Sequence, residues 1–286
     1  MNKGKMKKTR VAECADNSVN ICTGCAHGCL YCYAAFRAAR FKRCPRHQWT
    51  DEHVRPEAVK GLAGRLFQGR VMFPTAHDWT DLTRPHCQQA LAHMLAAGND
   101  VLVVSKARSQ IASDVHAVWK ACPRPNAIRP ELRMSITCVD EALRKFWEPN
   151  AAPISERVAA LRLAKGLGLP TSASLEPLLE PSKAVELVTW LEDYCVADEH
   201  GRGGEIWIGK ANNLPARTAW AKGVVPDIEG AVAALEAVQT DDAVMAVWVE
   251  LHGNPKVRWK DSYADAINRH IGQADAGTRG QGDAEK

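Results

Sequence analysis

Short apolar runs alternate with amphipathic helical patterns along most of this sequence. The clearest run, residues 101–104, reads Val-Leu-Val-Val, without the polar alternation of a half-exposed strand. Five runs of similar length cover residues 18–21, 70–73, 132–137, 171–175 and 205–208. Between the runs apolar residues recur at helical spacing, as in Ile111, Val115 and Val118 behind Ser109 as a possible N-cap. This pattern predicts repeated βα units and an α/β fold with a parallel sheet.

The length of 286 residues suits one large domain or two small ones, and an α/β barrel fits within it. We expect a basic arm over residues 1–16, a barrel over 17–212, and a mostly helical extension over 213–271 with helix at 228–250. Residues 272–286 are polar and glycine-rich, which predicts disorder.

The composition points to the cytoplasm. No run approaches the roughly eighteen apolar residues of a membrane span, and the basic N-terminus lacks the apolar stretch of a signal peptide. Ten cysteines without an export signal indicate a reducing compartment, where thiols stay free to bind metal. We therefore expect a cytoplasmic protein with no membrane contact.

Positive charge is unevenly distributed, although the net charge is only +4. Residues 1–10 carry five basic groups and no acid, and so do residues 37–46. Such clusters attract polyanions such as nucleic acid. The alternative is a solvated tail and a solvated helix face, since no recognised nucleic-acid-binding module accompanies the charge.

Four cysteines, Cys22, Cys25, Cys29 and Cys32, lie within eleven residues, and the last three have the spacing C-x3-C-x2-C. This spacing lets one short loop offer three thiolates to one metal centre. Zinc could use the pairs Cys22–Cys25 and Cys29–Cys32, but zinc pairs are usually about a dozen residues apart and only three residues separate these. A disulfide knot is disfavoured without a secretion signal.

The same run resembles the loop of the radical S-adenosylmethionine (SAM) superfamily, C-x3-C-x-aromatic-C. Tyr31 supplies the aromatic residue, and the flanks Thr23-Gly24 and Tyr33-Ala34 resemble the branch of proteins similar to spore photoproduct lyase. The resemblance covers roughly residues 17–212. It implies a partial (β/α)6 TIM-like barrel and a [4Fe–4S] cluster on Cys25, Cys29 and Cys32. The fourth iron would stay open for SAM.

The activity implied by this resemblance is reductive cleavage of SAM to methionine and a 5′-deoxyadenosyl radical, which takes a hydrogen atom from a substrate. It also implies a reducing electron donor such as flavodoxin or ferredoxin. The substrate is unknown, and nucleic acid is one candidate. Residues 73–77 contain no cysteine where spore photoproduct lyase has its hydrogen donor, so thymine-dimer repair is not predicted. The alternatives are a zinc-dependent nucleic-acid-binding module and an iron–sulfur sensor without catalysis.

Working residues of parallel α/β barrels lie at the C-terminal ends of the strands. The resemblance implies that Tyr31 packs near the adenine, that Ser135 serves the ribose and that Lys106 binds the SAM carboxylate. Glu176 ends an apolar strand, where a carboxylate is costly unless paired, so we expect it to contact SAM or substrate. Cys138 is a candidate hydrogen donor, although a free buried cysteine is more often a core residue.

His77 and Asp78 follow the second expected strand. They could orient a substrate or move a proton, and they could equally cap the next helix.

Overall fold

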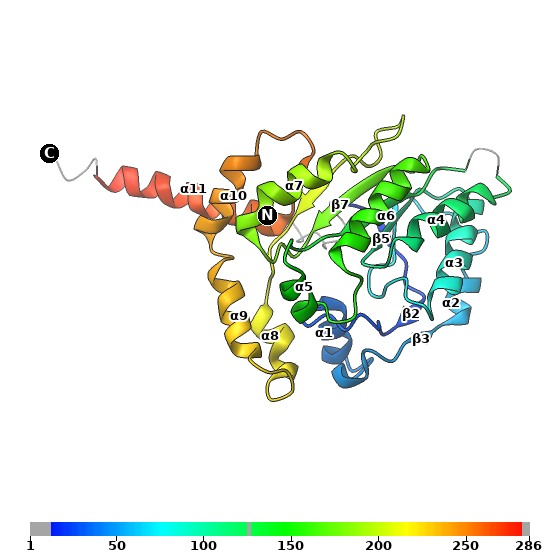
Figure 1. Ribbon diagram of the computed structural model, residues 1–286, viewed down its shortest axis with the longest axis horizontal. Helices are drawn as coiled ribbons and strands as arrows, with labels where there is room; N and C mark the ends of the chain where they lie inside the picture. The colour runs from blue at the N-terminus through cyan, green and yellow to red at the C-terminus, as the bar shows by residue number, and fades with distance from the viewer. Residues whose placement is uncertain (1–12, 125–126, 282–286) are drawn as a thin grey trace, which may run out of the picture.

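Seven parallel strands form one curled sheet, in the order β1-β4-β5-β6-β7-β8-β9. The computed structural model describes residues 13–124 and 127–281. The strands are β1 (Asn17–Ser18), β4 (Val71–Phe73), β5 (Val101–Ser105), β6 (Glu131–Ser135), β7 (Thr171–Leu175), β8 (Ile206–Ile208) and β9 (Val257–Trp259). Helices cover the outside of this half-barrel (Figure 1). The predicted α/β fold, a partial TIM-like barrel with outer helices, is confirmed.

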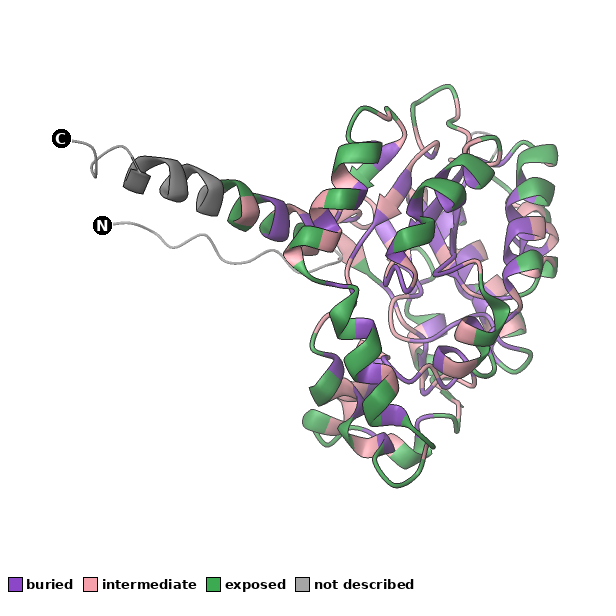
Figure 2. Ribbon diagram, turned by 60° about the vertical axis from the view of Figure 1, so that its left-hand side comes forward, coloured by how far each residue is buried: buried purple, intermediate pink, exposed green. Residues whose placement is uncertain are grey.

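Residue alternation along the strands gives the half-barrel two different faces. In β6, Leu132 and Met134 belong to the main apolar core, whereas Arg133 and Ser135 line an internal cavity. The outer face packs against helices α3 (Arg84–Ala96), α4 (Gln110–Lys120), α6 (Ile154–Gly166) and α7 (Ala184–Glu192). Figure 2 shows the buried residues between the sheet and these helices. Because side chains alternate between faces, apolar burial outside and polar groups inside coexist in one strand.

The seventh strand differs from the prediction of six. β9 pairs with β8 in parallel, with Val257 opposite Ile206. Its three residues lie between Lys256 and Lys260 and include Arg258, so the apolar signal was too short to indicate a strand. The segment after residue 212 therefore contributes to the barrel sheet as well as forming helices.

The C-terminal helices also differ from the prediction. The helix expected over 228–250 is two helices, α9 (Ile228–Ala237) and α10 (Asp241–Leu251). The Thr240 hydroxyl accepts a hydrogen bond from the Ala243 amide and caps the second of them. Helix α11 runs from Asp261 to Gln281 and thus includes residues 272–281, for which the composition predicts disorder. Residues 1–12 and 282–286, which include most of the predicted arm, lie outside the described residues.

The remaining described elements are short. They are β2 (Cys22–Thr23), which pairs antiparallel with β3 (His53–Val54), the helices α1 (Tyr33–Arg40), α2 (Pro56–Lys60), α5 (Glu141–Trp147) and α8 (Leu214–Thr218), and the 3-10 turns η2 (Arg46–Gln48), η3 (Pro181–Lys183) and η4 (Ala219–Ala221). Within the described residues, no helix combines the length and apolar character that a bilayer crossing requires.

Candidate cofactor and active site

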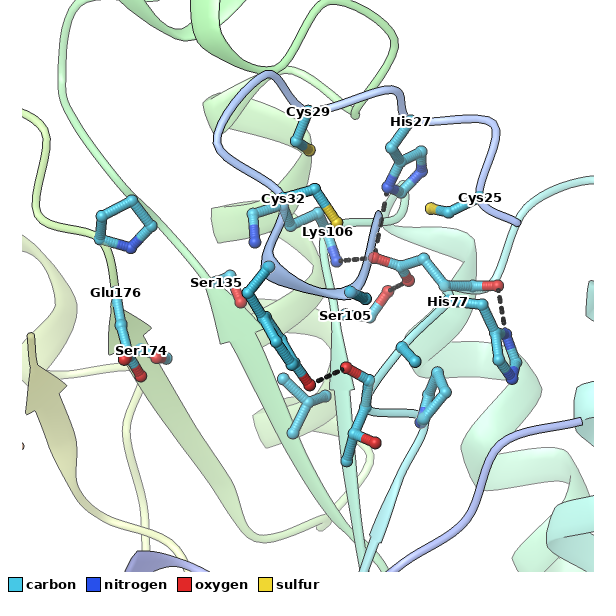
Figure 3. Close-up of a pocket in the computed structure, with 18 of the residues that line it drawn as sticks. Cys25, His27, Cys29, Cys32, His77, Ser105, Lys106, Ser135, Ser174 and Glu176 are labelled. Carbon is cyan, nitrogen blue, oxygen red and sulfur yellow. Dashed lines mark hydrogen bonds and ion pairs between the residues drawn. The ribbon is translucent and has the colours of Figure 1, made fainter. Parts of the chain in front are cut away.

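A cavity of about 220 Å³ lies at the C-terminal ends of the strands. Cys25, Cys29 and Cys32 all line it from one loop (Figure 3). The other predicted site residues that line it are Tyr31, Lys106, Ser135 and Glu176. One strand-end cavity therefore brings together all but one of the predicted site residues.

The cysteine loop depends on a glycine at its start. Gly24 has φ 95°, a conformation that residues with a Cβ rarely adopt, and a Cβ there would overlap the carbonyl oxygen of Asp51. Directly after it, the Cys25 amide donates to the Trp49 carbonyl over 2.8 Å. The cysteine loop thus turns in direct contact with the backbone of residues 49–51.

Two other segments hold the loop in place. The Ala26 amide donates to Glu52 Oε1 at 3.1 Å, and Asn150 Nδ2 donates to the Ala26 carbonyl at 3.0 Å. On the far side, the Leu30 amide donates to the Trp147 carbonyl at the end of α5 at 2.9 Å. The positions of the three cysteines are therefore set by contacts with residues 49–52 and 147–150.

Burial works against ionisation of the Cys25 and Cys29 thiols. It raises the pKa of Cys25 well above its ordinary value, and the negative charges of Asp78 and of the neighbouring cysteines add to the effect. Burial likewise raises the pKa of Cys29, with Glu148 as the next cause. Thiolates at Cys25 and Cys29 would therefore require a strongly cationic partner, which a bound metal group would supply.

Cys25, Cys29 and Cys32 share the cavity, and Cys22 lies apart from it. Among the described residues, no group of three or more His, Cys, Asp or Glu side chains converges on a point that could hold one metal ion. Cys22 lies in β2, does not line the cavity, and its thiol donates to the Thr23 carbonyl at 3.4 Å. In a cubane cluster each cysteine binds a different iron, so the sulfurs surround the group without meeting at a point. Cys25, Cys29 and Cys32 are the residues that would hold such a cluster.

Asp78 joins the cysteine loop to the strand ends. Its carboxylate accepts hydrogen bonds from Ser105 Oγ at 2.5 Å and from the Lys106 amide at 2.8 Å, and it lies 3.3 Å from His27 Nδ1. Burial opposes its ionisation, but the His27 imidazole and these hydrogen bonds outweigh burial and hold the pKa of Asp78 well below its usual range. Asp78 is thus an anionic anchor linking three segments.

His77 has a positioning role at the same place. Its Nε2 accepts a hydrogen bond from the Ile21 amide at 3.0 Å, just before the cysteine loop. Burial lowers the pKa of His77 to about 4, so the ring is neutral near pH 7 and can accept this bond. The ring fixes the entry to the loop, and neither His77 nor Asp78 caps the following helix.

A buried ion pair supports Tyr31 from behind. The Tyr31 hydroxyl donates to Glu148, and Glu148 pairs with Arg157 over 2.5 Å. Arg157 also donates to the Ser135 carbonyl at 3.0 Å, so this chain of contacts runs from the cysteine loop to the end of β6. Sequence reasoning missed Glu148 and Arg157. Arg157 lies on the apolar face of α6, near Ile154, and a basic residue in that position was a signal that could have identified it.

Glu176 has a buried cation beside it. Lys260 Nζ lies 3.6 Å from its carboxylate, and the lysine is 5% exposed. The same ammonium contacts Glu13 at 3.0 Å and Cys14 Sγ at 3.2 Å. Lys260 and Cys14 both line the cavity, and neither was predicted. Lys260 directly follows β9. Because the sequence did not indicate this strand, it did not indicate that Lys260 reaches the cavity either.

Cys138 is the predicted site residue that the structure does not bring to the cavity. Strand β6 ends at Ser135, so Cys138 lies in the following loop and not at a strand end. It is fully buried in an apolar cluster with Leu30 and Trp147, and its thiol donates to the Asp140 carbonyl at 3.3 Å. Burial raises its pKa to about 12. This placement makes Cys138 a core residue, not a pocket-facing hydrogen donor.

Arg46 contacts the cysteine loop from its outer side. Its guanidinium donates to the Cys29 carbonyl at 3.1 Å and stacks over the Trp220 ring with 3.9 Å to the centroid. Trp220 belongs to η4, so this arginine connects the loop to the C-terminal extension. Arginine suits such a position because its planar group can stack and donate hydrogen bonds simultaneously.

No protein-family model matches the sequence. An uncharacterised protein, ORF301 of Acidianus two-tailed virus, is 27% identical over 183 residues, which are 59% of this chain. The chain covers 58% of the viral protein's length.

Solved structures give a clearer comparison. A variant of spore photoproduct lyase superposes with a TM-score of 0.54 at 15% identity, over 90% of this chain and 80% of that one. The fold is similar to that of spore photoproduct lyase. A complex of that enzyme with dinucleoside spore photoproduct has a TM-score of 0.51 at 15% identity, over 78% of this chain and 66% of that one. A variant with bound AdoMet and the same dinucleoside gives 0.51 at 14% identity, with the same coverage.

Proposed function

We propose that the chain is a radical SAM enzyme that holds a [4Fe–4S] cluster through Cys25, Cys29 and Cys32. The observation that carries the proposal is the single cavity that these three cysteines share with the polar strand ends of a half-barrel. When bound, the cluster and SAM would supply one-electron cleavage of a sulfur–carbon bond and a radical able to remove a hydrogen atom from a substrate.

The cavity residues can bind and orient SAM. Lys106 follows β5, and its backbone is fixed by the bond from its amide to Asp78 and by its carbonyl, which accepts from the Ala152 amide at 3.1 Å. Its ammonium is the group for the SAM carboxylate. Ser135 on β6 and Ser174 on β7 offer neighbouring hydroxyls for the ribose. Glu176 offers a carboxylate for the SAM amino group or for the substrate.

Side chains packed on both sides of the cysteine loop would limit the access of water to it. Tyr31 is buried, and its hydroxyl is held by the Glu148–Arg157 pair, so its ring forms a fixed wall for the adenine. On the outer side of the loop, Arg46 and Trp220 cover Cys29. A reactive radical needs such a closed environment, since water and solvent-borne groups would otherwise intercept it.

Nucleic acid is the substrate class that we propose to test first. Two acidic residues, Asp78 and Glu176, line the cavity together with five basic ones: Lys106, Arg133, Lys210, Arg217 and Lys260. An excess of cations favours a substrate that carries phosphate. Acidic partners reduce this excess, as Asp241 does beside Lys210 at 3.6 Å, so a substrate phosphate would have to compete with them.

The test is anaerobic reconstitution with iron and sulfide, followed by measurement of bound iron, acid-labile sulfide and 5′-deoxyadenosine after reduction with SAM. We expect about four irons per chain and formation of 5′-deoxyadenosine. Cys29→Ala should lose both, whereas the matched Cys22→Ala variant should keep both. One zinc per chain that depends on Cys22 would instead indicate the zinc module. A cluster that leaves SAM intact would indicate the sensor.

A further inference from the structure

An exposed aromatic ring surrounded by arginines lies at the end of α1. Phe41 is 54% exposed, and the guanidinium carbons of Arg37, Arg40 and Arg43 lie 6.0, 5.9 and 5.6 Å from its ring centroid. All three arginines are exposed. These four residues are called the α1 surface below.

The charge of the α1 surface is not balanced locally. No acidic residue occurs between Asp16 and Asp51 in the sequence. Among the described residues, none of the three arginines takes part in an ion pair. Unpaired cations around an exposed aromatic side chain are typical of a surface that binds a partner, because arginine and aromatic residues carry most binding energy at interfaces.

The position of the α1 surface limits what the partner can be. Cys32 is the N-cap of α1, so the eight-residue helix begins at a proposed cluster ligand and is about 12 Å long. Only Tyr33 and Ala34 of this helix line the cavity. A partner on the α1 surface therefore comes close to the cysteine loop without entering the cavity. A substrate must enter the cavity, whereas a protein that delivers an electron only needs to approach the cluster.

We infer that the α1 surface docks a small acidic one-electron carrier protein that reduces the cluster. The inference rests on the proposed function, since it names a partner of that site. One electron leaves the carrier and enters the cluster, so the carrier is oxidised, the cluster is reduced, and no bond forms or breaks. Complementary charge would steer the encounter and orient the carrier. Phe41 would supply the apolar centre of a small, transient interface.

The experiment uses the reconstituted full chain and reduced flavodoxin, an acidic flavin protein, with dithionite as a small reductant. Stopped-flow spectroscopy would follow cluster reduction in wild type, in Phe41→Ala and in the triple variant Arg37→Gln/Arg40→Gln/Arg43→Gln. We expect flavodoxin to reduce the triple variant roughly tenfold more slowly or worse, with a weaker dependence on salt, because electrostatic steering is lost. Phe41→Ala should slow the same reaction, and dithionite should reduce all forms equally. The charge-matched control replaces three exposed basic residues on the outer helices α4 and α6 by glutamine: Lys120, Arg162 and Lys165.

Three results would overturn the inference: equal flavodoxin rates in wild type and triple variant, equal slowing with dithionite, or loss of binding to a labelled single-stranded oligonucleotide with flavodoxin reduction unchanged. The last result would identify the α1 surface as a nucleic-acid interface. Failure of the proposed function is distinguishable, because it appears as missing iron in the wild type before any mixing. Calorimetric titration of the cluster-free chain with flavodoxin then decides whether the surface binds the carrier.

Discussion

The carboxylate of Glu148 lies 2.5 Å from the guanidinium of Arg157, and both side chains are completely buried behind the cysteine loop. Burying two charges is expensive, and the cost is offset here because each group has further polar partners. Glu148 accepts from Tyr31 and from Thr137 Oγ1 at 3.2 Å, and Arg157 Nε donates to the Ala152 carbonyl at 2.8 Å. The pair therefore holds Tyr31 and the end of β6 in place at the site.

Removing one partner of this pair should be strongly destabilising. Arg157→Met leaves Glu148 as an unpaired buried carboxylate, and we expect it to lower the free energy of unfolding by about 3–5 kcal/mol. Glu148→Gln/Arg157→Met should recover part of that loss, since neither charge remains. Urea unfolding of the single and double variants measures the coupling. Additive effects would show that the two residues act independently.

Stability should depend on pH through His77. The pKa of His77 is about 4 in the folded chain and about 6.5 when unfolded. The unfolded chain therefore binds the proton first as the pH falls. The stabilisation from neutral His77 is complete above pH 6.5 and is lost progressively toward pH 4, about 3 kcal/mol in all. Urea unfolding at pH 7 and pH 4.5 should show a smaller difference in His77→Gln than in wild type. An equal difference in the two proteins would assign the pH dependence to other groups.

The turn at Gly24 should tolerate no side chain. Gly24→Ala introduces a Cβ that overlaps the Asp51 carbonyl, in addition to the strain of φ 95°. Gly64 is a matched control, because its φ is also positive at 69° and a Cβ there meets nothing within 4 Å. We expect Gly64→Ala to cost about 1 kcal/mol and to leave iron incorporation intact. Gly24→Ala should cost more and lose iron. Equal iron content in both variants would separate this turn from cluster binding.

Arg46 should influence the reduction potential of the proposed cluster. Its positive charge lies beside Cys29, and reduction makes the cluster more negative, so removing the charge should disfavour reduction. We expect Arg46→Gln to retain iron and to shift the potential negatively by on the order of 50 mV, close to a tenfold change for one electron. Trp220→Leu should produce a smaller shift, because the guanidinium loses its stacking partner but keeps its charge. Redox titration followed by electron paramagnetic resonance measures both shifts.

Local sequence features predicted the central parts of this molecule well. The run at residues 171–175 is β7 without any change of boundary, and the cysteine spacing indicated which three thiols line one cavity. Both are local signals, since an unbroken apolar run or a fixed spacing can be recognised without knowing which distant residues it contacts. Strand ends then indicated Lys106, Ser135 and Glu176, because parallel strands bring their ends to one edge of the sheet.

Contacts between distant segments were not predictable in this way. Glu148 and Arg157 belong to different helical segments, and nothing in either neighbourhood identifies the other as a partner. Lys260 meets Glu176 only because β9 joins the sheet, and three residues among charged neighbours gave no strand signal. Cys138 was misplaced by an error of two residues, since β6 ends at Ser135 and not at Thr137. Beyond Ser135 the alternation of the strand no longer applies, so it could not predict on which side Cys138 lies.

The two-faced strands have a consequence for how this chain could change over time. Leu132 and Met134 anchor the outer helices, while Arg133 and Ser135, their immediate neighbours, meet only the interior. A mutation at the inward position Ser135 can reshape the cavity while the packing of the outer helices is left unchanged, whereas Arg133 pairs with the buried carboxylate of Glu131 at 3.1 Å. In β6, residues that affect the chemistry of the cavity therefore alternate with residues that maintain the fold.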